Sequence, residues 1–204
     1  MPKIPILLLA AGKASRMGTP KQLIPWGNKT LFEHAVDTAL KLKNHPLFVV
    51  VGAHEKQLLP LVSPAITELV FNPEWQQGMG TSIAFGIKAI QKTVPNARGV
   101  LIFLVDQPLV DSAYLSSFFL AFQMNHKQII ASSYSDGRLG VPALFDAVYF
   151  KDLIAFTGDR GAKKLIEKQQ DNVLCISGGV FLSDVDTPEA YQDLLLKYFP
   201  NRQS

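Results

Sequence analysis

The chain of 204 residues is rich in apolar side chains, which make up 48% of it against 18% for charged ones. That balance excludes an intrinsically disordered protein and suits a single domain over residues 1–204. The formal net charge of +3 is too small to indicate nucleic-acid or membrane binding, so we expect neither partner. The single Cys excludes an intrachain disulfide and a multi-thiolate metal site, and it fits a reducing compartment.

The apolar start of the chain has some features of a signal peptide, but its details argue against one. The stretch 4–11 contains Pro5, is short for such a segment, and runs directly into Gly12 and Lys13. No apolar run reaches the roughly 20 residues that are needed to cross a bilayer. We therefore expect a cytoplasmic protein.

Apolar runs and helical patterns alternate along the chain. Strands are expected where apolar, β-branched and aromatic residues run together, and helices where apolar residues recur with a period near 3.6. A capping box at Thr30-Leu31-Phe32-Glu33 marks the first helix, and Asp111 and Thr187 are placed to cap later ones. In chain order the pattern predicts a strand at 6–10, a helix from 31, a strand at 47–51, a helix at 55–59, a strand at 66–71, a helix at 81–92, a strand at 100–105, a helix at 111–125, strands at 128–133 and 141–144, a helix at 161–169, a strand at 173–176 and a last helix from 187.

Strands that are apolar throughout and alternate with helices are typical of an α/β fold. We expect three layers, with a mostly parallel sheet covered by helices on both faces. Ligands of such folds bind in the crevice beyond the carboxyl ends of the strands, so the residues after each strand are the candidates for chemistry. Cys175 lies within the last predicted strand and is expected to be a small core residue.

The loop after the first strand combines small residues with positive charge. Gly12 and Gly18 allow the backbone to bend so that several N–H groups point into one concavity, and Lys13, Arg16 and Lys21 add three cations. The first 32 residues hold five cations and no acid, which suits a polyanion such as a triphosphate. The alternative is an ordinary turn with solvated lysines. The loop is neither a GxxxxGK[ST] phosphate loop nor a GxGxxG dinucleotide loop.

Three carboxylates follow later strands. Asp106 ends the strand at 100–105 and is followed by Gln107-Pro108, while Asp184 and Asp186 are two residues apart and so face the same side of an extended segment. Carboxylate oxygens together with phosphates are the ligands that Mg²⁺ prefers. The alternatives are a turn role for Asp106, solvent exposure for Asp184 and support of the last helix by Asp186.

Three glycine-containing stretches follow other strands. In the stretch 72–82, Gly78 permits close backbone approach and Ser82 falls in the first turn of a helix, so a planar base could rest there. The alternative is a loop anchored by a buried Trp75. The turns at 136–142 and 157–161 are either plain turns or substrate loops.

Taken together, these motifs resemble the MobA-like nucleotidyltransferases, which transfer NMP from an NTP onto a phosphate. The signature loop is Leu9-Ala10-Ala11-Gly12-x-x-Ser15-Arg16-Met17-Gly18-x-x-Lys21. The remaining stretches are similar to the molybdenum cofactor cytidylyltransferase branch, and the similarity runs from residue 4 to about 195. These stretches are Asn72-Pro73-x-Trp75-x-x-Gly78-Met79-x-x-Ser82, Asp106-Gln107-Pro108, Gly140-x-Pro142, Gly158-Asp159-x-Gly161-Ala162 and Asp184-Val185-Asp186-Thr187-Pro188.

The resemblance implies a role for each matching residue. Arg16, Lys21 and Asp106 would be catalytic, and Mg²⁺ would be the cofactor. Leu-Ala-Ala-Gly, where the guanylyltransferase relatives carry Leu-Ala-Gly-Gly, implies CTP through Ala11. One departure is Lys164, where the family often carries Arg. The implied nucleotide contacts are Leu9, Ala10, Ala11, Gly12, Arg16, Lys21, Gly78 and Ser82, the implied metal ligands are Asp106, Asp186 and Asp184, and the implied second-substrate contacts are Gly140, Pro142 and Asp159.

The resemblance implies that the substrates are CTP and a phosphorylated pterin, with a recipient molybdoenzyme as partner. CMP would pass from CTP to the terminal phosphate of a molybdopterin-type cofactor, and pyrophosphate would leave. One alternative is a nucleotidyltransferase for a sugar phosphate, phosphocholine or methylerythritol phosphate. Another is a non-catalytic carrier of the molybdenum cofactor. Because all three carboxylates are present, we favour the enzyme.

Overall fold

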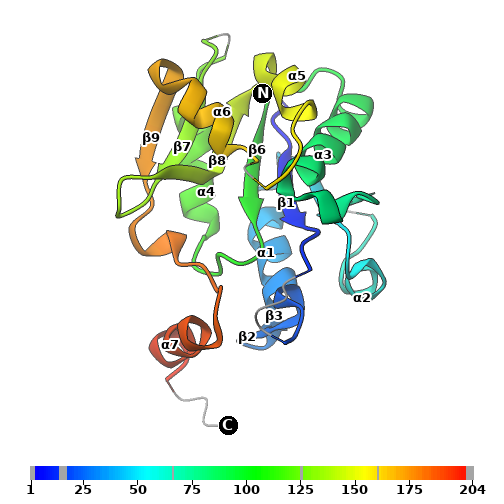
Figure 1. Cartoon of the computed structure of the whole chain (residues 1–204), viewed down its shortest axis with the longest axis vertical. Coiled ribbons are helices and arrows are strands. Elements are labelled where there is room, and N and C mark those ends of the chain that lie inside the picture. Colours follow the sequence, from blue (N-terminus) through cyan, green and yellow to red (C-terminus); the bar gives the residue numbers. More distant parts are fainter. Residues whose placement is uncertain (1–2, 14–17, 66, 125, 160, 201–204) are drawn as a thin grey trace.

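A seven-stranded sheet forms the middle layer of the computed structural model, which describes residues 3–13, 18–65, 67–124, 126–159 and 161–200. The strand order is β5-β4-β1-β6-β8-β7-β9, and only β8 among them runs antiparallel to its neighbours (Figure 1). The strands are β1 Ile6–Ala10, β4 Leu47–Val51, β5 Glu68–Phe71, β6 Gly99–Leu104, β7 Ile129–Ser133, β8 Leu139–Asp146 and β9 Val173–Ser177, and a small hairpin pairs β2 Pro25–Trp26 with β3 Lys29–Thr30.

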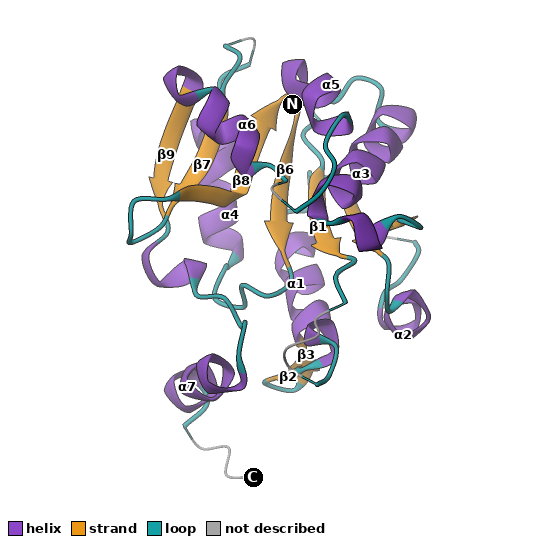
Figure 2. Cartoon of the chain, in the orientation of Figure 1, coloured by secondary structure: helices purple, strands orange, loops and turns teal. Residues whose placement is uncertain are grey.

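Helices cover both faces of this sheet (Figure 2). Successive side chains of a strand point to opposite faces, so Leu8 of β1 packs into one core cluster and Leu7 and Leu9 into the other. The first cluster is closed by α1 and α4, and the second by α3, α5 and α6. The three-layer α/β prediction is confirmed. The helices are α1 Leu31–Leu40, α2 Glu55–Leu58, α3 Met79–Thr93, α4 Ser112–Ala121, α5 Phe150–Ile154, α6 Lys163–Lys168 and α7 Pro188–Tyr198.

Local capping signals place the helix starts correctly. Thr30 accepts a hydrogen bond from the backbone of Glu33, whose carboxylate accepts one from the backbone of Thr30 in return. Asp111 accepts from the backbone of Tyr114 at the start of α4. Thr187 caps α7, which has Pro188 at its first position. Each cap satisfies a backbone N–H that has no partner within its own helix.

Other details differ from the sequence expectations. The helix after Asp111 ends at Ala121 rather than near 125, and α5 was not expected because it is only five residues long. Cys175 is exposed rather than in the core, since β9 is an edge strand that pairs only with β7. The expectation of a buried Cys175 was therefore wrong. None of the helices in the described ranges is long and apolar enough to span a membrane.

The parallel strands bring their carboxyl ends to one edge of the sheet. The carboxyl end of β1 lies between those of β4 and β6, because β1 pairs in parallel with both. The loops after β1, β5 and β6 therefore meet at this edge. The C-terminal helix α7 lies beyond it beside the β2–β3 hairpin, where the Tyr191 hydroxyl donates to the carbonyl of Pro25 at 2.6 Å (Figure 1).

Candidate active site

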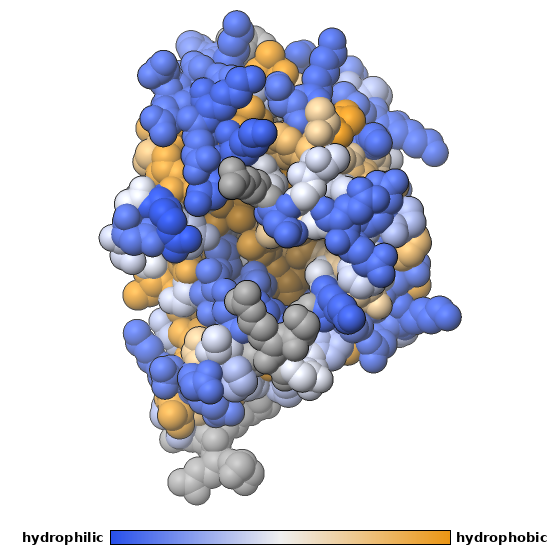
Figure 3. All heavy atoms as spheres, in the orientation of Figure 1, coloured by the Kyte–Doolittle hydropathy of each residue, from blue (hydrophilic) through white to orange (hydrophobic). Residues whose placement is uncertain are grey.

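A cavity of about 390 Å³ opens beyond the carboxyl ends of β1 and β6. In Figure 3 a hollow with an apolar floor lies in the middle of the visible face, with hydrophilic side chains around it. The lining combines apolar residues such as Leu104 and Met79 with the charged residues Lys21 and Asp106. Of the residues predicted for the site, those that line the cavity are Leu9, Ala10, Ala11, Gly12, Lys21, Gly78, Ser82, Asp106 and Asp159.

The first loop is held by hydrogen bonds to its carbonyl groups. The amide nitrogen of Gln22 donates to the carbonyl oxygens of Ala10 at 2.9 Å and Gly12 at 2.7 Å. The backbone N–H of Ala53 donates to the carbonyl of Ala11 at 3.2 Å. Arg16, predicted to act beside Lys21, lies outside the described residues.

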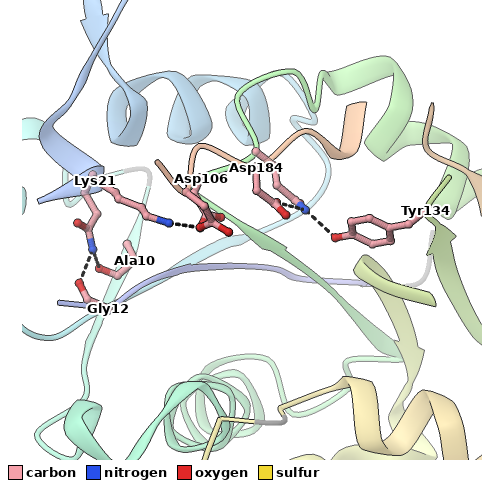
Figure 4. Close-up of polar contacts among 9 residues, drawn as sticks. Ala10, Gly12, Lys21, Asp106, Tyr134 and Asp184 are labelled. Carbon is pink, nitrogen blue, oxygen red and sulfur yellow. Dashed lines mark hydrogen bonds and ion pairs between the residues drawn. The ribbon is translucent and has the colours of Figure 1, made fainter. Parts of the chain in front are cut away.

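Lys21 pairs with two of the predicted carboxylates. Its ammonium lies 3.4 Å from Oδ2 of Asp106 and also contacts Oδ1 of Asp186 (Figure 4). Burial by itself lowers the pKa of Lys21, but the hydrogen bond to Asp186 and the charge of Asp106 outweigh it, so the net shift is upward. The side chain of Lys21 is 16% exposed, against 53% for Asp186. The lysine therefore bridges the two carboxylates as a charged ammonium.

Asp106 is more buried than Asp186, with 26% of its side chain exposed against 53%. Burial raises its pKa, and the charge of Lys21 offsets part of that rise. Its Oδ1 is buried and has no hydrogen-bond partner among the described residues. A buried carboxylate oxygen without a donor is costly unless a cation or another ligand completes it.

The third carboxylate, Asp184, belongs to a separate hydrogen-bonded group. Its Oδ1 accepts a hydrogen bond from the amide nitrogen of Gln107 at 3.0 Å, and the same nitrogen donates to the Tyr134 hydroxyl at 2.8 Å (Figure 4). Burial, with the charge of Asp106 second, raises the pKa of Asp184 to about 6. Burial also raises the pKa of Tyr134 to about 12, so its hydroxyl keeps its proton at neutral pH. The Tyr134 hydroxyl donates a hydrogen bond to the carbonyl of Val141 at 2.9 Å.

The predicted three-carboxylate cluster does not form in this structure. Among the described residues, no group of three or more His, Cys, Asp or Glu side chains has the spacing of a metal site. The reason is that Lys21 lies between Asp106 and Asp186, while Gln107 engages Asp184. The oxygen donors are nevertheless those that Mg²⁺ or Mn²⁺ binds, and the unpartnered Oδ1 of Asp106 suits a hard cation. In this structure Lys21 is paired with both Asp106 and Asp186, the two carboxylates that offer such donors beside the cavity.

Asn72 fixes the wall of the cavity that holds Ser82. It is fully buried, and its amide nitrogen donates to the hydroxyl oxygens of Thr81 at 3.0 Å and Ser82 at 2.9 Å. Its carbonyl accepts from the backbone of Glu74 at 2.8 Å. The stretch 72–82 was predicted to approach a base, and the side-chain amide of Asn72 holds this stretch together.

Asp159 lies on the same wall, beside Gly78. A Cβ at Gly78 would come within 2.4 Å of a carboxylate oxygen of Asp159, and the backbone of Gly80 donates to the carbonyl of Gly158 at 2.8 Å. The two loops therefore pack without room for a side chain. Asp159, predicted to contact the second substrate, lies in the same cavity as the residues predicted to bind the nucleotide.

Two predicted residues, Gly140 and Pro142, lie on β8 and do not line this cavity. Gly140 instead faces the ring of Tyr134, where an added Cβ would lie 3.1 Å away. Lys13, predicted as one of the three loop cations, and Trp75, predicted as a possible loop anchor, also line the cavity. The sequence reasoning assigned no role to the other residues that line it, which are Gln22, Gln76, Met79, Leu104 and Val105. The signal available for Gln22 was its place directly after Lys21 in the sequence.

Comparisons with known proteins give a family match. The chain fits the profile of the MobA-like NTP transferase domain over residues 6–173. It is 29% identical to nicotine blue oxidoreductase of Paenarthrobacter nicotinovorans, over 96% of this chain and 98% of that protein. It is 28% identical to the molybdenum cofactor cytidylyltransferase of Escherichia coli (strain K12), over 45% of this chain and 47% of that protein. The two relatives are named for different activities, so their similarity does not identify a substrate.

A solved structure with a bound metal is also similar. Rv0371c of Mycobacterium tuberculosis H37Rv, in complex with manganese, matches with a TM-score of 0.76 and 27% identity, over 95% of this chain and 98% of that one. That protein therefore binds a divalent cation, manganese.

Proposed function

Because the chain belongs to the MobA-like NTP transferase family, a family of nucleotidyltransferases, we propose that it transfers CMP from CTP to the terminal phosphate of a molybdopterin-type molybdenum cofactor. Pyrophosphate is the second product. The substrates are then a nucleoside triphosphate and a phosphorylated pterin, and the site must hold two highly charged anions close together.

One observation carries this proposal: a single cavity gathers the loop after β1, Lys21 and Asp106. The loop offers backbone N–H groups to phosphate oxygens, and the lysine supplies a positive charge. Asp106 supplies a carboxylate at the end of the adjacent strand. Only a ligand that carries both phosphates and a cation uses all three features.

The proposed reaction is an in-line displacement at the α-phosphorus of CTP. An oxygen of the acceptor phosphate forms the new P–O bond, and the bond from the α-phosphorus to the bridging oxygen breaks, so that pyrophosphate leaves with the electron pair. The nucleophile is already an anion, so no residue has to remove a proton. Catalysis then rests on positioning and on neutralisation of charge.

Residues of this chain supply the positioning and the neutralisation of charge. Lys21 offsets negative charge on the phosphates once it leaves Asp106 and Asp186. Those two carboxylates, with Asp184 as a further candidate, would then hold Mg²⁺. A bound divalent ion neutralises phosphate charge and orients the triphosphate. Arg16 is proposed to act beside Lys21.

The choice of CTP rests on sequence. Ala11 gives the loop the Leu-Ala-Ala-Gly form, and the E. coli relative that matches part of the chain is a cytidylyltransferase. The acceptor is proposed to contact Asp159, which lines the cavity, and Gly140 and Pro142, which lie outside it on β8. Gln107 and Tyr134 connect Asp184 to β8. Gln107 donates to Asp184 and to the Tyr134 hydroxyl, which donates to the carbonyl of Val141 on β8.

A binding screen tests this assignment directly. Thermal shift would be measured with CTP, GTP and UTP in the presence of Mg²⁺, each with and without the pterin cofactor, a sugar phosphate, phosphocholine or methylerythritol phosphate. We expect CTP to stabilise the protein most, and the pterin cofactor to add to that shift. Stabilisation by another phosphate would support a different nucleotidyltransferase. Stabilisation by the pterin cofactor without any effect of CTP would support a carrier.

A further inference from the structure

Gln22 lies beneath the first loop of the cavity. It is 4% exposed and follows Lys21 in the short 3₁₀ helix Lys21–Leu23. Its amide nitrogen donates to the carbonyls of Ala10 and Gly12. Two carbonyl partners can be met only by the NH₂ end of an amide, and they use both of its hydrogens.

These two hydrogen bonds determine which way the loop's N–H groups point. In a trans peptide the C=O and the following N–H point in opposite directions. Holding the carbonyls of Ala10 and Gly12 toward Gln22 therefore turns the N–H groups of Ala11 and Lys13 away from it. The carbonyl between them, on Ala11, is held by the N–H of Ala53. All three successive peptide groups thus have a set direction, which is what an anion-binding concavity requires.

Two residues besides Gln22 contact carbonyls in the described part of the loop: Ala53, and His54, whose Nε2 lies 3.2 Å from the carbonyl oxygen of Lys13. A Cβ built on Gly12 meets no atom within 4 Å, so packing at that glycine does not dictate the backbone. The Oε1 atom of Gln22 is buried without a hydrogen-bond partner among the described residues. An apolar side chain would avoid that cost, so the two donated hydrogen bonds are what an amide contributes here.

We propose that Gln22 is a positioning residue, which holds residues 10–13, at the end of β1 and the start of the following loop, in the conformation that binds the triphosphate. This inference rests on the proposed function, because it takes the cavity to be a triphosphate site. Gln22 acts through the peptide groups of the loop and touches neither the base nor the reacting phosphorus.

Substitutions at Gln22 separate this role from simple packing. Gln22→Glu keeps the shape but directs a carboxylate at two carbonyl oxygens, whereas the protonated acid restores one donor. We expect affinity for inorganic tripolyphosphate to fall about tenfold or more at pH 8, as the loss of one or two hydrogen bonds implies. Relative to wild type at each pH, the loss should shrink as the pH falls toward 5.5. Gln22→Met has no donor and should show the same loss at every pH.

Isothermal titration calorimetry with tripolyphosphate and with CTP, in the full-length protein, provides the measurement. Gln76→Glu is the matched control, because Gln76 also lines the cavity and, in the described part of the loop, the carbonyls of Ala10 and Gly12 accept from Gln22 instead. It measures the effect of one added negative charge, which should not recover in the same way at low pH. For the Gln22 variants, both probes should lose affinity by a similar factor.

Any one of three results would overturn this inference and leave the proposed function standing. These are wild-type affinities in both Gln22 variants, a pH response of Gln22→Glu no different from that of Gln76→Glu, and a loss of affinity for CTP but not for tripolyphosphate. The last result would mean that Gln22 contacts the nucleoside. A wild-type protein that binds neither tripolyphosphate nor CTP would instead overturn the proposed function, and the inference with it.

Discussion

The ammonium of Lys21 lies 3.4 Å from Oδ2 of Asp106 and also contacts the carboxylate of Asp186. One positive charge thus lies between two carboxylates that come from distant parts of the chain. In the proposed mechanism a divalent cation needs the same two carboxylates. Lys21 and the metal would then compete for one place until the phosphates of a bound nucleotide attract the lysine.

Replacing Lys21 tests this competition. In Lys21→Met the two carboxylates lose their ammonium partner, so Mn²⁺ should bind to the nucleotide-free protein about tenfold more tightly than to wild type. Turnover should fall by orders of magnitude, because the charge that the phosphates attract is gone. Free Mn²⁺ is measured by electron paramagnetic resonance during a titration.

Lys13→Met is the control for that titration. Lys13 also lines the cavity, but its ammonium makes no ion pair with the carboxylates of the described site. It should therefore change Mn²⁺ affinity only slightly. Equal or weaker Mn²⁺ binding by Lys21→Met would show that the lysine does not hold the metal position.

Asp106→Asn should separate stability from activity. The substitution removes a buried charge whose pKa is raised by burial, and Lys21 keeps Asp186 as a partner. The melting temperature without metal should therefore be no lower than that of wild type, while Mg²⁺-dependent turnover falls about 100-fold or more. Differential scanning fluorimetry and a pyrophosphate assay measure the two quantities. Wild-type turnover in Asp106→Asn would remove this carboxylate from the mechanism.

Asp184 should make stability depend on pH. Its pKa is raised from 3.8 to about 6, by burial first and by the charge of Asp106 second. The folded state then holds the proton more tightly than the unfolded chain, so this group lowers the free energy of unfolding as pH rises from about 4 to about 6.

Asp184→Asn keeps an acceptor for Gln107 and cannot ionise. The difference in unfolding free energy between Asp184→Asn and wild type should therefore depend on pH. We expect it to favour the variant by about 1 kcal/mol more above pH 6 than at about pH 4. Urea denaturation of both proteins across this range measures the change. A difference in unfolding free energy that does not vary with pH would mean that Asp184 titrates normally.

Much of the framework of the site follows from local sequence. The strand Ile6–Ala10 and the helix start at Thr30 depend on neighbouring residues alone, so apolar pattern and capping chemistry predict them. The position of Asp106 beyond the end of β6 also follows, because parallel strands bring their carboxyl ends to one edge.

Long-range contacts could not be predicted in this way. Lys21 meets Asp186 across 165 positions of sequence and Gln107 meets Asp184 across 77, so no local pattern reveals either pair. The exposure of Cys175 depends on the place of β9 at the edge of the sheet. An apolar run of the same composition would be buried in a central strand.

Gly78 gives a test of the packing between the two loops. It has φ of +104°, and a Cβ would lie 2.4 Å from the carboxylate of Asp159 and 2.5 Å from the carbonyl carbon of Gly158. Gly78→Ala should therefore cost about 2–3 kcal/mol of stability and raise the KM for the nucleotide.

Gly137→Ala is the control for Gly78→Ala, because it measures the cost of backbone strain without a steric clash. Gly137 has φ of +82° and open space around the position of an added Cβ, so only strain of about 1 kcal/mol applies. Urea denaturation compares the two variants. Equal losses would mean that the contact with Asp159 and Gly158 is not tight in solution.

The most direct measurement is pyrophosphate release from CTP. Wild-type protein would be incubated with Mg²⁺, a molybdopterin-type molybdenum cofactor and, in parallel, CTP, GTP or UTP. We predict one pyrophosphate for each cytidylylated cofactor with CTP, little with the other nucleotides, and none when the cofactor is omitted. Pyrophosphate released equally from GTP would contradict the choice of CTP, and no pyrophosphate from any nucleotide in the presence of the cofactor would contradict the proposed reaction.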